Sequence, residues 1–145
     1  MAGSEQKSAQ EKKPLMRILL TLALVLVPGA FAQDNLADFR PVVVKTAPSA
    51  GSESVDPALT EIQVVFSRKM LDKSWSVVQI NPDLFPKTQG QGAYSPDGKT
   101  FLLKVKLEPG KTYALWFNQG VRFDKFKDSE GKAAVPYLLY FQTKK

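Results

Sequence analysis

The sequence predicts an all-β fold, a Greek-key β-sandwich of about seven short strands. Two observations support this prediction. Segments in which apolar and polar residues alternate follow one another from residue 41 to residue 143 of the 145-residue chain. Turn signals rich in glycine, proline and aspartate separate these segments, and no helical pattern of any length lies between them. A chain of this length provides one such domain.

The expected strands differ in how clearly they alternate. The segment 100–107 alternates best, with four apolar residues on one face and Lys104 and Lys106 on the other. Pro41 begins the first segment, a position at which edge strands tolerate proline. Six clear strands are expected at residues 41–46, 60–66, 74–80, 100–107, 112–118 and 137–143, and a weaker one at 93–95.

Residues 107–117, LEPGKTYALWF, combine a strand end, a Pro-Gly turn and a new strand. This passage is typical of the tyrosine corner of an immunoglobulin-like (Ig-like) sandwich, in which a tyrosine hydroxyl bonds back to the nearby backbone. We therefore expect an Ig-like sandwich with Tyr113 as the corner tyrosine. Trp75, on the third expected strand, is expected in the core, where such sandwiches often bury a tryptophan. Both residues are expected to be structural.

Residues 1–32 have the order of a secretory signal peptide. Basic residues precede an apolar run at 18–27, and the triplet Ala30-Phe31-Ala32 fits a cleavage site. The apolar run has ten residues, whereas a membrane span needs about 20. We expect export to the periplasm or the extracellular space, cleavage near Ala32 and no membrane span afterwards. The start can be Met1 or Met16. Residues 33–40 then form a linker and residues 41–145 the domain.

The chain after residue 32 has 16 basic and 12 acidic residues, a net charge of +4. This mild excess suits a soluble surface with weak attraction to anionic envelope polymers. The chain has no cysteine, so neither a disulfide nor a cysteine-linked lipid anchor is available. The core alone must stabilise the domain, which is feasible at this length.

Several short motifs follow the expected strands in order. After the first strand comes P-x-x-G at 48–51, and then V-D-P-x-x-x-x-I-x-V-x-F-S-x-x-M at 55–70. L-x-P-G-x-x-Y at 107–113, D-x-x-G at 128–131 and a closing F-x-T at 141–143 complete the series. Together they resemble the bacterial Ig-like domains of the SbsA type, first noted in S-layer proteins. The resemblance implies the same sandwich in an exported, adhesive or spacer-like role, with no shared catalytic residues.

A second resemblance, to periplasmic copper carriers of the CopC type, rests on the P-x-x-G opening and the F-S strand. Copper prefers soft sulfur and nitrogen ligands. The chain has no histidine and no cysteine, and Met70 is its one methionine after residue 32. A CopC-like metal carrier is therefore disfavoured, and no metal or cofactor is expected.

The absence of histidine also excludes Ser-His-Asp and Cys-His nucleophile systems and the usual zinc sites. Asp124, Asp128 and Glu130 cluster in one loop and suggest a calcium site or an acid/base pair. The spacing of a calcium-binding loop is not met, and lysines interleave the acids. The favoured interpretation is an ordinary Asp/Gly turn, and the protein is expected not to be an enzyme.

Three residues are candidates for contact with a partner. Trp116 falls on the strand face opposite Tyr113 and Leu115, where it can meet a protein or a sugar ring, or be covered by neighbouring residues. Lys104 and Lys106 form a basic stripe that fits an anionic wall polymer or a solvated edge. No nucleic-acid-binding motif is present.

The leading hypothesis is an exported non-enzymatic Ig-like module that binds or builds the bacterial cell envelope. The alternative is an accessory or inhibitor domain that docks on an exported hydrolase. In either case the partner is an unidentified envelope protein or polysaccharide. The sequence does not distinguish these two hypotheses.

Overall fold

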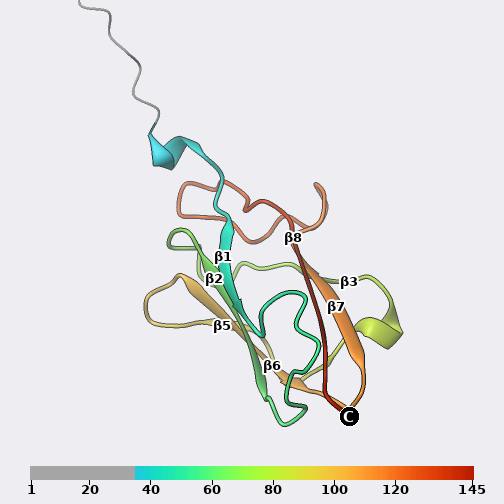
Figure 1. Cartoon of the computed structure of the whole chain (residues 1–145). Helices are drawn as coiled ribbons and strands as arrows, with labels where there is room; N and C mark the ends of the chain where they lie inside the picture. Colours follow the sequence, from blue (N-terminus) through green and yellow to red (C-terminus); the bar gives the residue numbers. More distant parts are fainter. Residues whose placement is uncertain (1–34) are drawn as a thin grey trace, which may run out of the picture. The chain divides into compact units, whose positions relative to one another are not determined.

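The computed structural model describes residues 35–145, which fold into two antiparallel sheets (Figure 1). The prediction of an all-β sandwich is confirmed. The signal peptide expected at residues 1–32 lies outside the described residues. In the first sheet the order is β1-β2-β6-β4, and β5 also pairs with β6. Its strands are β1 (Val43–Ala47), β2 (Glu61–Phe66), β4 (Lys87–Thr88), β5 (Ala93–Tyr94) and β6 (Thr100–Lys106).

The second sheet has the order β3-β7-β8. Its strands are β3 (Val77–Gln79), β7 (Thr112–Phe117) and β8 (Tyr137–Gln142). Two 3-10 helices, η1 (Leu36–Asp38) and η2 (Pro82–Leu84), complete the described part. Neither has the length or the apolar composition to cross a bilayer, and no other helix occurs within residues 35–145.

The core lies between the sheets and follows the alternation of the sequence. Inward-facing side chains of β2, β6, β7 and β8 are almost completely buried, because every second residue of a strand points to the same face. Phe126 comes from the long loop after β7 and is also fully buried. Its ring centroid lies 4.9 Å from that of Phe101 and 5.2 Å from that of Phe66. The loop therefore contributes a central part of the core.

Two strands differ from the expected ones. The third strand is shorter than the expected residues 74–80, since β3 covers only Val77–Gln79. Just before it, the Ser74 hydroxyl donates to the Lys125 carbonyl and the Ser76 hydroxyl accepts from the Lys125 N–H. β4 was not expected, since its two residues, Lys87 and Thr88, are too few to show alternation.

The hairpin between β5 and β6 turns at Pro96-Asp97-Gly98. Gly98 has φ +66°, a value that glycine adopts at low cost. The Asp97 carboxylate accepts hydrogen bonds from the Ser95 hydroxyl and from the backbone N–H groups of Lys99 and Thr100. These bonds, that of Ser95 first, lower the pKa of Asp97 to about 2.

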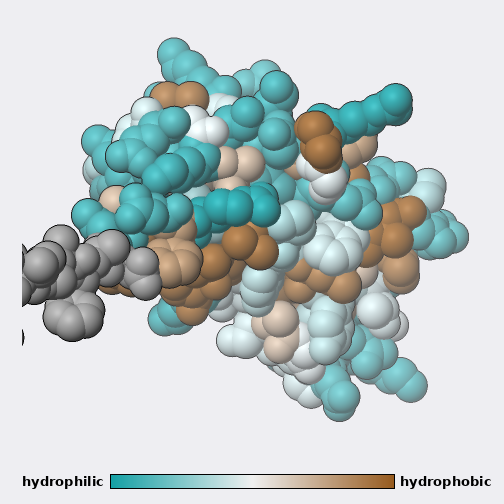
Figure 2. Space-filling view, turned by 90° about the horizontal axis from the view of Figure 1, so that it is seen from above, coloured by the Kyte–Doolittle hydropathy of each residue, from teal (hydrophilic) through white to brown (hydrophobic). Residues whose placement is uncertain are grey.

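Figure 2 shows the domain from above the view of Figure 1, with apolar patches separated by hydrophilic side chains. Among the described residues, large apolar side chains that remain exposed include Ile80, Phe123 and Tyr140. Scattered exposed apolar residues are normal in soluble proteins. A local concentration of them on one strand face is more informative.

Candidate functional site

The outer face of the second sheet carries an apolar row that crosses all three strands. Cross-strand pairing places Trp116 of β7 between Val78 of β3 and Leu138 of β8. Trp116 is half-buried, as are its two partners, whereas its chain neighbours Leu115 and Phe117 are buried in the core. Trp116 therefore lies outside the core, and the strands on either side cover only part of its ring.

The next row of this face continues the apolar surface. Ala114 of β7 pairs with Tyr140 of β8, whose side chain is 52% exposed. We call the five residues Val78, Ala114, Trp116, Leu138 and Tyr140 the Trp116 face. None of them is charged, although 23% of the residues of the chain are. Neither Phe123 nor Phe126 is part of this face, because Phe126 lies in the core and Phe123 lines a separate groove.

The lysine stripe lies on the outer face of the first sheet. Lys104 and Lys106 are exposed on β6. Lys104 lies opposite Glu61, and Lys106 lies opposite Lys87. The acidic partner offsets the charge of Lys104, so the stripe is weaker than the sequence suggests.

A second acid moderates the positive charge at the end of this stripe. The Glu108 carboxylate pairs with Lys111 at 3.2 Å and with Lys87 at 3.3 Å. Lys111 and then Lys87 lower the pKa of Glu108, and Glu108 raises the pKa of Lys111. These ion pairs are exposed, so each adds little to stability.

Tyr113 is buried at the start of β7. Its hydroxyl oxygen accepts a hydrogen bond of 2.8 Å from the backbone N–H of Glu108, five residues earlier. The Thr143 hydroxyl donates to the Glu108 carbonyl and accepts from the Lys111 N–H. These bonds close the turn between β6 and β7 onto the end of the chain.

Trp75 lies just before β3 and is half-buried. Its ring packs against Phe101 with centroids 5.5 Å apart and against Tyr94 at 6.4 Å. Burial, and secondarily the negative charge of Asp72, raise the pKa of Tyr94. Trp75 thus covers one edge of the aromatic core and keeps part of its surface at the exterior.

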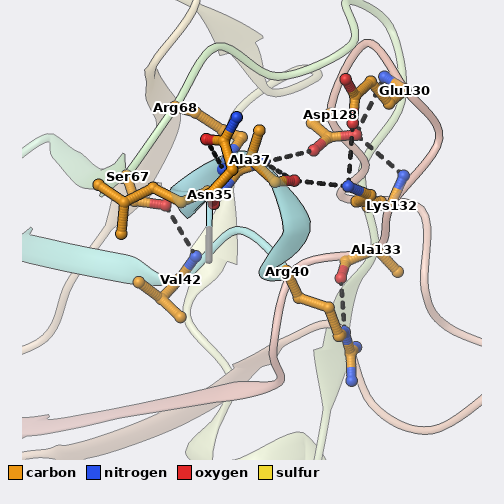
Figure 3. Close-up of polar contacts among 11 residues, drawn as sticks. Asn35, Ala37, Arg40, Val42, Ser67, Arg68, Asp128, Glu130, Lys132 and Ala133 are labelled. Atoms are coloured by element: carbon orange, nitrogen blue, oxygen red, sulfur yellow. Dashed lines mark hydrogen bonds and ion pairs between the residues drawn. The ribbon is translucent and has the colours of Figure 1, made fainter. Parts of the chain in front are cut away.

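In the acidic loop around residues 124–131, the Asp128 carboxylate accepts hydrogen bonds from donor groups of the protein itself (Figure 3). One oxygen of the buried Asp128 carboxylate accepts hydrogen bonds from the N–H groups of Glu130 and Lys132 at 3.0 and 2.9 Å. Its other oxygen lies 3.4 Å from the guanidinium of Arg68. In the part that the structure describes, no group of three potential ligands could hold a metal ion. This arrangement fits a structural Asp/Gly turn.

Arg68 also fixes the segment that precedes β1. Its guanidinium donates to the carbonyls of Leu36 and Ala37, and the Lys132 ammonium donates to the same Ala37 carbonyl (Figure 3). Arg40 donates to the carbonyls of two further residues, Ala133 and Ala134. The described part of the expected linker thus lies against the domain through hydrogen bonds. The sequence motif at 55–70, which includes Arg68, did not predict the hydrogen bonds from Arg68 to this segment.

Comparison with known protein families supports the Ig-like architecture described above. A family model described as the bacterial Ig-like domain matches residues 37–143. The chain therefore belongs to the bacterial Ig-like domain family, as the motif series predicted at the family level. No curated protein matched.

Three solved structures are similar to this chain. The N-terminal part of the bacterial S-layer protein SbsC matches at 20% identity with a TM-score of 0.48, covering 75% of this chain and 24% of that one. The S-layer protein rSbsC(31-844) matches at 22% identity with a TM-score of 0.46, covering 75% of this chain and 14% of that one. CopC from Methylosinus trichosporium OB3b matches at 14% identity with a TM-score of 0.50, covering 72% of this chain and 94% of that one. At this identity the CopC match shows the fold alone.

Proposed function

We propose that this protein is an exported, non-enzymatic Ig-like module that binds a component of the bacterial cell envelope through the Trp116 face. Export is supported by the signal-peptide pattern of residues 1–32, with cleavage near Ala32. An envelope role is supported by the family and by the motif series of the SbsA type. The site location rests on one observation, the uncharged apolar row across β3, β7 and β8.

Desolvation of apolar side chains favours binding at the Trp116 face. Trp116, Leu138 and Tyr140 are partly or largely exposed, so a partner that covers them removes apolar area from water. Tryptophan and tyrosine are common anchors of binding surfaces, because they supply large contact area at low conformational cost. None of the five residues of this face is charged, so binding there removes water from no charged side chain of the face. Binding there should consequently depend weakly on salt.

Lys104 and Lys106 give an electrostatic alternative on the opposite sheet. Attraction between exposed charges is screened at moderate ionic strength, where the Debye length is about 8 to 10 Å. The salt dependence of binding therefore shows which of the two surfaces binds the partner. The Trp116 face predicts binding that survives moderate salt, and the lysine stripe predicts binding that does not.

The test is co-sedimentation of the purified protein with isolated cell-wall sacculi at low and moderate salt. We expect salt-resistant pelleting that Trp116→Ala weakens and the double variant Lys104→Gln/Lys106→Gln preserves. Pelleting that disappears with salt would contradict the assignment to the Trp116 face. A protein that stays in solution at both salt concentrations would contradict wall binding and favour an exported protein, such as a hydrolase, as the partner.

A further inference from the structure

A groove of about 450 Å³ lies at one edge of the sandwich and includes none of the residues of the Trp116 face. It lies between β3, the edge strand of the second sheet, and the connection from β4 to β5 at the edge of the first sheet. Trp75, which precedes β3, and Val77 of β3 line one side, and Leu103 lines it from β6. Phe85, which follows η2, and Phe123, from the loop after β7, complete its apolar wall.

The groove exists because the chain leaves the sheet between β4 and β5. The Gln89 N–H still bonds to the Lys104 carbonyl at 2.8 Å, and the following residues then turn away until β5 resumes the ladder. Gly92 packs directly on Phe101, since a Cβ atom there would lie 2.1 Å from the ring. Gly90 has φ +77° and no atom within 4 Å of a Cβ position. This connection adds bare backbone to the groove.

The chemistry of the lining is aromatic and uncharged. Trp75, Phe85 and Phe123 supply rings, and Phe123 is 48% exposed. The polar side chains of the lining, Ser76, Thr88 and Gln91, are hydroxyl and amide groups. None of the lining residues is ionisable, although the chain carries 20 lysines and arginines and 14 acids.

This lining restricts the ligand. An anionic polymer would find no cation to replace its lost hydration, and a cationic peptide would find no carboxylate. A peptide added as a strand would need a run of free backbone groups at a sheet edge. β3 has three residues and β4 has two, and the glycine connection departs from the ladder, so the edge offers no such run.

We propose that this groove binds an uncharged glycan chain. The C–H faces of sugar rings are apolar and stack on aromatic rings, and their hydroxyls bond to the Ser76, Thr88 and Gln91 side chains. The groove is open to solvent, so a polymer can pass along the edge of the sandwich and contact the ring of Trp75. This site shares no residue with the Trp116 face, and it stands or falls independently of that surface.

The chain has two tryptophans, so Trp116→Phe leaves Trp75 as the single reporter of the groove. We would titrate this variant with N-acetylglucosamine hexamer and with cellohexaose, and follow Trp75 fluorescence. The expected result is a saturable change with at least one of the two. Calorimetry of the unchanged protein with the same sugars gives a second readout that does not depend on the variant.

The controls use two residues of one loop. Phe123→Ala removes a groove ring and should weaken binding roughly tenfold, whereas Val121→Ala changes a side chain that is 91% exposed and outside the lining, and should not. Absence of saturable binding up to about 10 mM sugar overturns the proposal, and so does an equal loss in both variants. A response to a neutral proline-rich peptide without any response to sugar overturns it as well. If the protein binds sugar but does not pellet with sacculi, the groove proposal stands and the proposed function of the Trp116 face fails.

Discussion

Replacing Asn118 by alanine should strongly destabilise the domain. Asn118 follows β7 in the left-handed region, with φ +58°, and is 1% exposed. Its amide nitrogen donates to the carbonyls of Phe126 and Ala134, both at 3.1 Å. Its amide oxygen accepts from the Phe126 N–H at 2.9 Å. One side chain thus connects the end of β7 to two points of the long loop.

The magnitude follows from these contacts. Three hydrogen bonds at about 1 kcal/mol each give about 3 kcal/mol, and more if the backbone groups of the loop remain buried without partners. Alanine at positive φ adds about 1 kcal/mol, a cost that glycine avoids. We expect a loss of about 4 kcal/mol for Asn118→Ala and about 3 kcal/mol for Asn118→Gly. Small domains have about 5 to 15 kcal/mol in total.

The assay is urea unfolding followed by tryptophan fluorescence, with the free energy extrapolated to water. Gln119→Ala is the matched control, because this neighbouring side chain is exposed and should change stability by less than about 0.5 kcal/mol. A cost below about 1 kcal/mol for Asn118→Ala would refute the assignment of Asn118 as the connection between strand and loop.

Three further predictions concern single positions. Tyr113→Phe removes the acceptor of the Glu108 N–H and should cost about 1 to 2 kcal/mol in urea unfolding; an unchanged midpoint would contradict the corner bond. Gly92→Ala brings a Cβ atom within 2.1 Å of the Phe101 ring and should lower stability by about 1 to 3 kcal/mol or more; a neutral result would mean that the ring can move. The hydrogen bonds of its turn hold the pKa of Asp97 at about 2, so its stabilising contribution is present above pH 3.8 and is lost as the pH falls toward 2. The difference in melting temperature between the unchanged protein and Asp97→Asn should therefore be smaller at pH 2.5 than at pH 5, and an equal difference at the two pH values would oppose this linkage.

The fold could be predicted from the sequence because strand alternation and turn chemistry act locally. Ile62, Val64 and Phe66 alternate in the sequence and are all at most 2% exposed in the structure. The turn at Gly98 needs a positive φ that the sequence itself signals. Such features depend on residues a few positions apart.

The missing parts depend on contacts between distant segments. Arg68 and the segment before β1 are about thirty residues apart in the chain, and only the fold brings them together. Asn118 is the last residue of the expected strand 112–118, yet its side chain is buried by a loop that starts one residue later. The groove arises where β4, a strand too short to recognise, gives way to a glycine connection. The sequence alone could not say whether Trp116 is exposed, because it did not show which face of β7 packs in the core. Leu115 is buried, so Trp116 lies on the outer face.

The central claim is that an envelope component covers the Trp116 face. Hydroxyl-radical labelling of the purified protein, with and without isolated sacculi, measures this by mass spectrometry. We expect Trp116 and Tyr140 to become protected in the sacculus-bound protein, whereas the half-buried Tyr94, on the other sheet, is labelled equally in both samples. Unchanged labelling of Trp116 and Tyr140 in protein that has pelleted with the sacculi would contradict the claim.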